Sequence, residues 1–339
     1  TPRAEQTYGP DRGWCADGLG ATAERTGAGP CYGGQDGATA DNAAPLPGSE
    51  HFSRAVVAGA AVANVDFGFS YNVVTNLQAA FAGALDAPSY QGSLDQFLRN
   101  ANAIVGVNAM RFVPAVPTNA AGGGGTWWQI DYTGTIAGQT PVMSHDAGTT
   151  VDGTAYDLAD GVAVRDTNGN YLGANALGGM LVGVGDVPLP QVEKPELELI
   201  RSDSGIGAAL PVDANAATSQ SPDNFTVRSM AISGWARSIW MASVAGFRPT
   251  GVTIEDNVLG SGSSTFTDQG VPGTIHGVYV RATDGGSLSN NLIGFVDNDG
   301  AVLADVTGWT IAGNEVREAA QVNAGSDGIN DGAGSSGNT

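Results

Sequence analysis

The chain has 339 residues, 42% of them hydrophobic, and its 14 basic and 34 acidic residues give a formal net charge of −20. Such acidity repels phosphate backbones, so nucleic acid is excluded as an expected partner. No apolar run reaches the roughly eighteen residues of a membrane span, and no span is predicted. The apolar content suffices for a core larger than one compact domain usually holds, which predicts an elongated body or two domains.

Residues 1–74 are predicted to form a small β-sandwich-like module. They are polar and rich in glycine up to two apolar runs, and the second run, Asp66–Val74, alternates apolar and polar residues as a half-buried strand does. A disulfide between Cys15 and Cys31 would constrain a segment that has little core of its own. Two free thiols in a cytosolic protein are the alternative interpretation.

A short amphipathic helix is predicted from Ser93 to Ile104. Ser93 can cap the helix, and Gln96, three residues later, completes the pattern of a capping box. The apolar residues that share one face are Leu94, Phe97, Leu98, Ala101 and Ile104. After the helix, short runs rich in β-branched and aromatic residues alternate with Gly and Pro turns, which predicts all-β structure.

The sequence repeats itself between Asn224 and Val316. Gly277–Ile293 aligns with Gly300–Val316 without a gap, at a constant offset of 23 residues. A third copy spans Ser238–Leu259 and contains the insertion Gly246–Thr250, and a half copy, Phe225–Ile232, precedes it. Each unit holds two or three short strands separated by Gly or Asn bends, which leaves no room for a helix. The pattern predicts a β-solenoid, in which each coil pairs with its neighbours.

The alignment of these copies also predicts which side chains point into the solenoid. The inward rows are Ile239/Val278/Ala301, Met241/Val280/Leu303 and Ile254/Leu288/Ile311. The residues that align at one bend are Asn257, Asn291 and Asn314. These asparagines either hydrogen-bond from coil to coil or serve only as turn formers, and both interpretations agree with a solenoid.

One outward strip is singled out as a candidate binding surface or interface. If Ile239 and its row point inward, then Trp240, Tyr279 and Val302 point outward from the same sheet, and Arg281 follows Tyr279 on its strand. An exposed apolar strip would bind glycan rings or another subunit. The alternative is that an insertion, Ser261–Thr274, folds back and covers the strip.

The predicted domains are the module at 1–74, the solenoid at 75–322 and a Gly/Ser-rich linker at 323–339. The helix at 93–104 lies where an N-terminal cap belongs, because an uncovered end coil exposes unpaired strand edges. Both ends of the chain are interpreted as cut from a longer protein, with further coils expected beyond Thr339.

Gly92–Asn102 resembles the capping-helix signature of bacterial surface right-handed β-helix proteins, with Asp95 where Arg is usual. Asn290–Gly294 and Gly313–Val316 resemble the repeats of the parallel β-helix group that also holds pectate lyases, phage tailspikes and surface adhesins. Val65–Phe69 is similar to the closing strand of prealbumin-like B-type modules in large bacterial surface proteins. The resemblance implies a right-handed parallel β-helix at the cell surface, but no particular activity.

Candidate chemistry is sparse. A polysaccharide lyase or hydrolase would gather carboxylates and a basic residue on one outer face, and Arg281 with Asp305 is the candidate pair. Asp297–Asp299 is a candidate calcium site, for which solvated turn aspartates are the commoner alternative. No catalytic residue is assigned, and no cofactor is predicted.

These observations predict a non-enzymatic structural or adhesive module of an extracellular bacterial surface protein, with assembly into a fibre or surface layer as one form. The expected partners are further copies of the chain or surface glycans. Two alternatives stay open, namely a polysaccharide lyase or hydrolase of the β-helix type, and a passive glycan-binding module that uses Trp240 and Tyr279.

Overall fold

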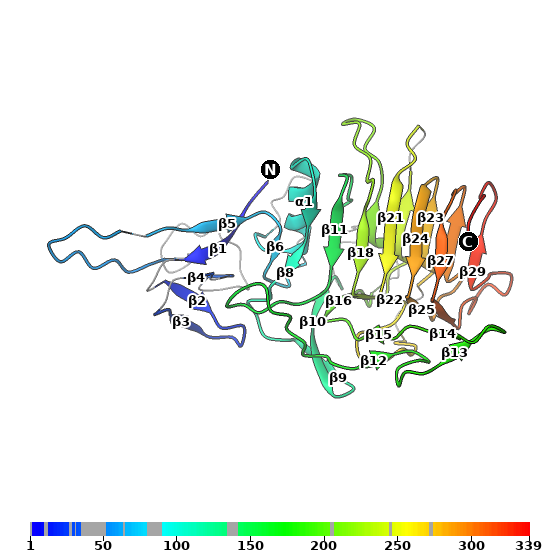
Figure 1. Cartoon of the computed structure of the whole chain (residues 1–339), viewed down its shortest axis with the longest axis horizontal. Helices are drawn as coiled ribbons and strands as arrows, with labels where there is room; N and C mark the ends of the chain where they lie inside the picture. Colours follow the sequence, from blue (N-terminus) through cyan, green and yellow to red (C-terminus); the bar gives the residue numbers. More distant parts are fainter. Residues whose placement is uncertain are drawn as a thin grey trace. The chain divides into compact units, whose positions relative to one another are not determined.

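A computed structural model describes most of the chain in two compact units. The described residues are 2–9, 13–26, 29–30, 32–34, 52–63, 65–79, 90–133, 142–203, 207–243, 246–270 and 274–339. The first unit comprises Thr1–Ile104, Met110–Asn119 and Thr154–Asp166, and the second comprises Val105–Ala109, Ala120–Gly153 and Thr167–Thr339. β-Structure with parallel sheets dominates (Figure 1). Among the described residues, no helix is long and apolar enough to cross a membrane.

The first unit holds a three-stranded antiparallel sheet in the order β4-β1-β5 and two smaller pairs. Its strands are β1 (Glu5–Gly9), β2 (Trp14–Ala16), β3 (Thr22–Glu24), β4 (Gly29–Pro30), β5 (Gly68–Ser70), β6 (Val73–Val74) and β8 (Arg111–Phe112). β2 and β3 form an antiparallel hairpin, and β6 pairs with β8 in parallel. Cys15 lies in β2, whereas Cys31 lies outside the described residues, so the disulfide stays a prediction.

The predicted helix is confirmed as α1 (Leu94–Ala103), with Ser93 as its N-cap. The Ser93 hydroxyl accepts a hydrogen bond from the Gln96 backbone N–H at 3.2 Å. The capping box differs from the prediction, because the Gln96 amide donates to Asn100 Oδ1 at 2.7 Å and the Ser93 N–H donates to Tyr90 O. The role of α1 as a cap on the solenoid stays a prediction.

Three larger sheets make up the second unit. Sheet 1 contains, in spatial order, β28 (Glu315–Arg317), β25 (Leu292–Gly294), β22 (Val258–Leu259), β19 (Met230–Ser233), β16 (Leu197–Ile200), β10 (Gly125–Asp131) and β9 (Ala120–Gly122). Sheet 2 contains β27 (Thr310–Ala312), β24 (Asp284–Ser289), β21 (Thr250–Glu255), β18 (Thr226–Arg228), β11 (Thr149–Asp152) and β7 (Asn108–Ala109). Sheet 3 contains β17 (Ala208–Val212), β20 (Arg237–Ala242), β23 (His276–Arg281), β26 (Ala301–Ala304) and β29 (Ile329–Asp331).

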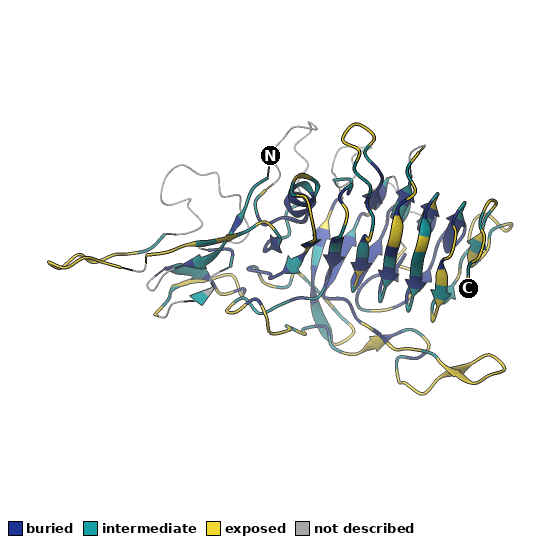
Figure 2. Ribbon diagram, turned by 45° about the horizontal axis from the view of Figure 1, so that its top comes forward, coloured by how far each residue is buried: buried dark blue, intermediate teal, exposed yellow. Residues whose placement is uncertain are grey.

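All pairings within these sheets are parallel except that of β9 with β10. From β16 to β29 the chain visits sheets 1, 3 and 2 in turn, so each circuit adds one strand to each sheet. Figure 2 shows the buried face that the sheets enclose.

The predicted inward rows are confirmed by the strand registers. Ile239 pairs with Val278, which pairs with Ala301, and the Met241 and Ile254 rows are in register in the same way. Every member is buried except Ile311, which is half-buried on the last circuit. Alternation along each strand therefore builds a continuous core between the sheets.

The segment predicted as a flexible linker continues the last circuit. β29 pairs in parallel with β26, with Ile329 opposite Ala301. The Ser335 hydroxyl donates to Leu303 O at 3.1 Å, and the Trp309 N–H donates to Asn338 Oδ1 at 2.8 Å. The Gly and Ser residues that suggested a linker form bends whose polar groups bond to the preceding circuit.

Candidate functional site

The strip predicted on sheet 3 is in register but only partly open. Trp240, Tyr279 and Val302 are successive neighbours across β20, β23 and β26. Trp240 and Tyr279 are half-buried, and Val302 is 9% exposed. The Arg237 guanidinium lies 5.4 Å from the centre of the Tyr279 ring, and Arg281 is exposed at the end of β23. This face therefore offers less apolar surface than an open ladder would.

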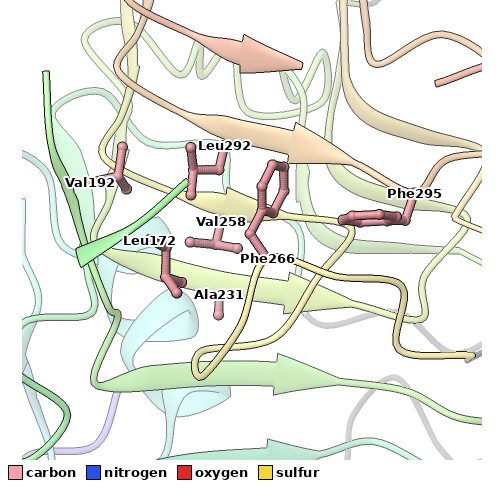
Figure 3. Packing of buried hydrophobic residues seen from close by; sticks show 7 residues of the cluster. All are labelled: Leu172, Val192, Ala231, Val258, Phe266, Leu292 and Phe295. Atoms are coloured by element: carbon pink, nitrogen blue, oxygen red, sulfur yellow. The ribbon is translucent and has the colours of Figure 1, made fainter. Parts of the chain in front are cut away.

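The outward face of sheet 1 is covered by a segment of the same unit. We call residues 167–195 the covering segment; it contains β12 (Tyr171–Leu172), β13 (Leu181–Val182), β14 (Val187–Pro188) and β15 (Val192–Glu193). Figure 3 shows its Leu172 and Val192 beside residues of β19, β22 and β25. The buried cluster consists of Leu172, Val192, Ala231, Val258, Phe266, Leu292 and Phe295. Phe266 belongs to the insertion expected to cover sheet 3, but it packs on sheet 1, where Leu292 and Phe295 provide apolar contacts.

A carboxyl group is buried beneath these coverings. Glu198 is 3% exposed, and its Oε2 accepts hydrogen bonds from Trp127 Nε1 at 2.5 Å and Gln129 Nε2 at 3.0 Å. Burial raises the pKa of the Glu198 carboxyl, although these bonds and one to the Ser263 backbone oppose that shift. Glu198 thus connects β10 and β16 to the insertion that carries Phe266.

Glu196, two residues earlier on the same face, holds the start of the covering segment. Its Oε1 accepts from the backbone N–H groups of Thr167 and Asn168, both at 2.8 Å, and its Oε2 accepts from the Thr167 hydroxyl at 2.6 Å. The Asn168 amide in turn donates to Ser263 O at 3.0 Å. The two glutamates accordingly act as polar anchors for the chain segments that cover sheet 1.

Sheet 2 presents a row of hydroxyls to solvent, which we call the hydroxyl face. Its members are Thr150, Thr226, Thr253, Ser287 and Thr310, each paired with the next across adjacent strands. Their neighbours along the strands, such as Val227 and Ile254, are buried, so the hydroxyls point outward. None of the five hydroxyls bonds to another residue in the described ranges, and four are half-buried while Thr310 is exposed.

A row of charged and small residues runs beside the hydroxyl face. Asp152, Arg228, Glu255 and Ser289 are successive neighbours across β11, β18, β21 and β24. Arg228 Nε donates to Asp152 Oδ2 at 2.9 Å, and its Nη1 lies 3.9 Å from Glu255 Oε1. The face as a whole can donate and accept hydrogen bonds along its length.

The three aligned asparagines form a ladder at the bend between sheets 2 and 1. Asn257 Nδ2 donates to Asn291 Oδ1 at 3.0 Å, and Asn291 Nδ2 donates to Asn314 Oδ1 at 2.9 Å. The same oxygens accept the backbone N–H groups of Asn257 and Asn291. Asn257 and Asn291 are fully buried, so the ladder satisfies polar groups that water cannot reach.

The residues considered for catalysis and calcium binding have local partners. Asp305 Oδ2 accepts from Arg248 Nη1 at 3.1 Å, while Arg281 is paired in register with Ala304. Asp299 Oδ1 accepts from the Asp327 N–H at 2.7 Å. Within the described residues, no group of three or more His, Cys, Asp or Glu side chains could hold a metal ion.

Comparisons with known proteins found no match, whether the search used protein-family models, curated proteins or solved structures.

The hydroxyl face was not predicted from the sequence, although the repeats contain its signal. Thr253, Ser287 and Thr310 each precede one member of the predicted inward row of Ile254. Because side chains alternate along a strand, the residue before an inward position must point outward. Glu198 carried no such signal, since it lies before the repeats and its partners are distant in sequence.

Proposed function

We propose that the chain is a right-handed parallel β-helix of a bacterial surface protein, and that it acts outside the cell as a non-enzymatic adhesive module. The ordered circuits from β16 to β29 support the β-helix. The surface location rests on the resemblance of Gly92–Asn102 to a capping-helix signature. The hydroxyl face is the observation that carries the adhesive function.

An extended glycan is the ligand that suits the hydroxyl face. Adjacent strands are about 4.8 Å apart, so the five hydroxyls cover about 19 Å in a straight row. Successive rings of an extended polysaccharide offer hydroxyl groups at a similar repeat. Arg228 and Glu255 beside the row can donate to and accept from sugar hydroxyls. Multiple weak hydrogen bonds along one polymer chain then add up to useful avidity.

Binding to a panel of insoluble and soluble polysaccharides tests this function. The variant Thr226→Val/Thr253→Val/Ser287→Ala removes three hydroxyls, while valine keeps the β-branched shape that strands favour. We expect it to lose at least about tenfold in affinity, the equivalent of about 1.4 kcal/mol. The matched control Thr22→Val/Thr26→Val/Thr218→Val changes three exposed threonines elsewhere and should bind normally.

Three results would contradict the proposal in different ways. Binding by the wild-type protein to none of the polysaccharides would remove the adhesive function. Unchanged binding by the hydroxyl-face variant, with loss in Trp240→Ala/Tyr279→Ala, would move the site to sheet 3. Depolymerisation of any polysaccharide by the purified protein would show that the module is an enzyme.

A further inference from the structure

Two arginines of the second unit lack the ion pairs that its other arginines form. The arginines of this unit with a carboxylate partner are Arg201, Arg228, Arg248 and Arg317. Within the described residues, the side chains of Arg237 and Arg281 make no salt bridge and no hydrogen bond. The stretches of this unit that lie outside the described residues contain no Asp or Glu. In a chain of net charge −20, these two charges therefore have no direct carboxylate partner in their own unit.

Arg237 and Arg281 lie on the outward side of sheet 3, on either side of Tyr279. Arg237 is opposite His276 in the register of β20 and β23, and its Cζ lies 5.4 Å from the centre of the Tyr279 ring. Arg281 follows Tyr279 on β23 with one residue between them, so alternation turns both side chains to the same face. Trp240 pairs with Tyr279 across the two strands. Two guanidinium groups thus flank a pair of aromatic rings.

The donors of both arginines are available to a ligand. Arg237 is half-buried, and its Nε is buried without a hydrogen-bond partner in the described residues. Its two Nη atoms are neither buried nor hydrogen-bonded there. The face of the Tyr279 ring attracts this cation and holds it in place. Arg281 is exposed, and each planar guanidinium can donate two parallel hydrogen bonds to one carboxylate.

We propose that this side of sheet 3 binds a polysaccharide that contains uronic acids, with sugar carboxylates on Arg237 and Arg281 and a sugar ring on Trp240. The five strand residues from the level of His276 to Arg281 span about 16 Å, which is the length of a few sugar rings. The apolar face of a pyranose ring packs on an aromatic side chain. The Tyr279 ring already contacts Arg237, so Trp240 is the ring left for the sugar. The site lies on a different sheet from the hydroxyl face and takes a charged glycan.

The acidity of the whole chain does not prevent this contact. At physiological ionic strength, exposed charges more than about 8 Å apart are largely screened from each other. Asp213 and Asp299 border this side of sheet 3, but they are only 9% and 8% exposed. Asp213 Oδ1 accepts from the Ala214 N–H and Asp299 Oδ1 from the Asp327 N–H, both at 2.7 Å. The exposed charges that a ligand meets around Tyr279 are thus those of the arginines.

Isothermal titration calorimetry on the full chain tests the site with two matched sugars. The charged probe is a tetramer of β-1,4-linked glucuronic acid, and cellotetraose is the same chain without carboxylates. Arg237→Gln/Arg281→Gln should lower the affinity for the glucuronate tetramer at least about tenfold, because it removes charge-assisted hydrogen bonds. Its affinity for cellotetraose should not change, which also shows that the variant folds. Arg281→Gln alone, at an exposed position, should lower the glucuronate affinity several-fold.

Two control variants separate this site from net charge and from the hydroxyl face. Arg54→Gln/Arg317→Gln removes the same charge from side chains that are 61% and 40% exposed, and it should bind the glucuronate tetramer normally. The hydroxyl-face variant Thr226→Val/Thr253→Val/Ser287→Ala should also keep this affinity while it loses uncharged glycans. Failure of that second effect alone would contradict the adhesive function and leave the uronate site intact.

Four results would overturn the uronate site. The first is a wild-type chain that does not bind the glucuronate tetramer, and the second is normal binding by Arg237→Gln/Arg281→Gln. The third is an equal loss in Arg54→Gln/Arg317→Gln, which would assign the effect to net charge. The fourth is arginine-dependent binding of a tetraglutamate peptide with equal or higher affinity, which would make an acidic peptide the ligand.

Discussion

Asn291 uses both atoms of its amide to join three successive circuits. Its oxygen accepts from the Asn257 backbone and side chain, and its nitrogen donates to Asn314 Oδ1 and to Ile254 O at 2.9 Å. No water can replace these bonds without entering the interior, since the side chain is fully buried. Such a residue contributes far more than a solvated turn asparagine does.

Asn291→Ala should therefore lower the free energy of unfolding by about 2–4 kcal/mol, because it leaves several buried polar groups without partners. Asn314→Ala, at the half-buried end of the ladder, should cost less. Urea denaturation of both variants measures the difference. Equal losses would show that the ladder does not act through burial.

Glu198 predicts a pH dependence of stability. Burial raises the pKa of its carboxyl above the ordinary value of 4.5, so the folded chain holds this proton more tightly than the unfolded chain does. Between the unfolded and folded pKa values, the free energy of unfolding should fall as pH rises. Glu198→Gln should reduce this fall, as measured by urea denaturation from pH 4 upward. Glu193→Gln, at an exposed position, should keep the wild-type slope, and identical slopes in both variants would refute the prediction.

The insertion between β20 and β21 contains Arg248, whose side chain connects two later circuits. It donates to both oxygens of Asp284 at 2.8 Å and to Asp305 Oδ2 at 3.1 Å. Asp284 and Asp305 belong to successive circuits, so one side chain bridges both. The Arg248 guanidinium lowers the pKa of the Asp284 carboxyl accordingly.

Arg248→Ala should destabilise the chain by about 1 kcal/mol at low salt, since the network is partly exposed and such pairs contribute little individually. The loss should shrink at high salt, where these charges are screened. Arg281→Ala removes an exposed arginine at the end of β23 and serves as the control. Thermal unfolding at two salt concentrations measures both. A loss for Arg248→Ala that does not depend on salt would point to packing.

The repeats predicted the strands of sheets 2 and 3 because the alignment of the copies determines both register and facing. Leu288 and Ile311 follow from the offset of 23 residues, and Ile254 follows from the alignment of the third copy. The covering segment could not be predicted in this way, because its position depends on contacts such as Thr167 with Glu196 that recur in no other circuit. Composition also did not distinguish a flexible linker at 323–339 from the bends that the structure has there. Glycine and serine are common both in flexible linkers and in hydrogen-bonded bends.

For the second unit as a whole, each circuit contacts mainly its neighbours, so stability should be distributed unevenly along the stack. β27, β28 and β29 are the edge strands of sheets 2, 1 and 3 and belong to the last circuit. In this 339-residue chain their amides should exchange at least about tenfold faster than those of β21 and β24. Hydrogen exchange resolved by residue checks this gradient. Uniform protection would instead indicate one cooperative unit.

The corner after sheet 1 differs in length between circuits: residues 260–275 connect β22 to β23, whereas 295–300 connect β25 to β26. Despite this difference in loop length, β22 pairs with β25 in register, and β23 pairs with β26 in register. A foreign peptide inserted at such a corner would leave the strand pairing on either side of it intact. Copies of it at successive corners would project at intervals of about 4.8 Å, which makes this unit a candidate frame for displaying epitopes at fixed spacing.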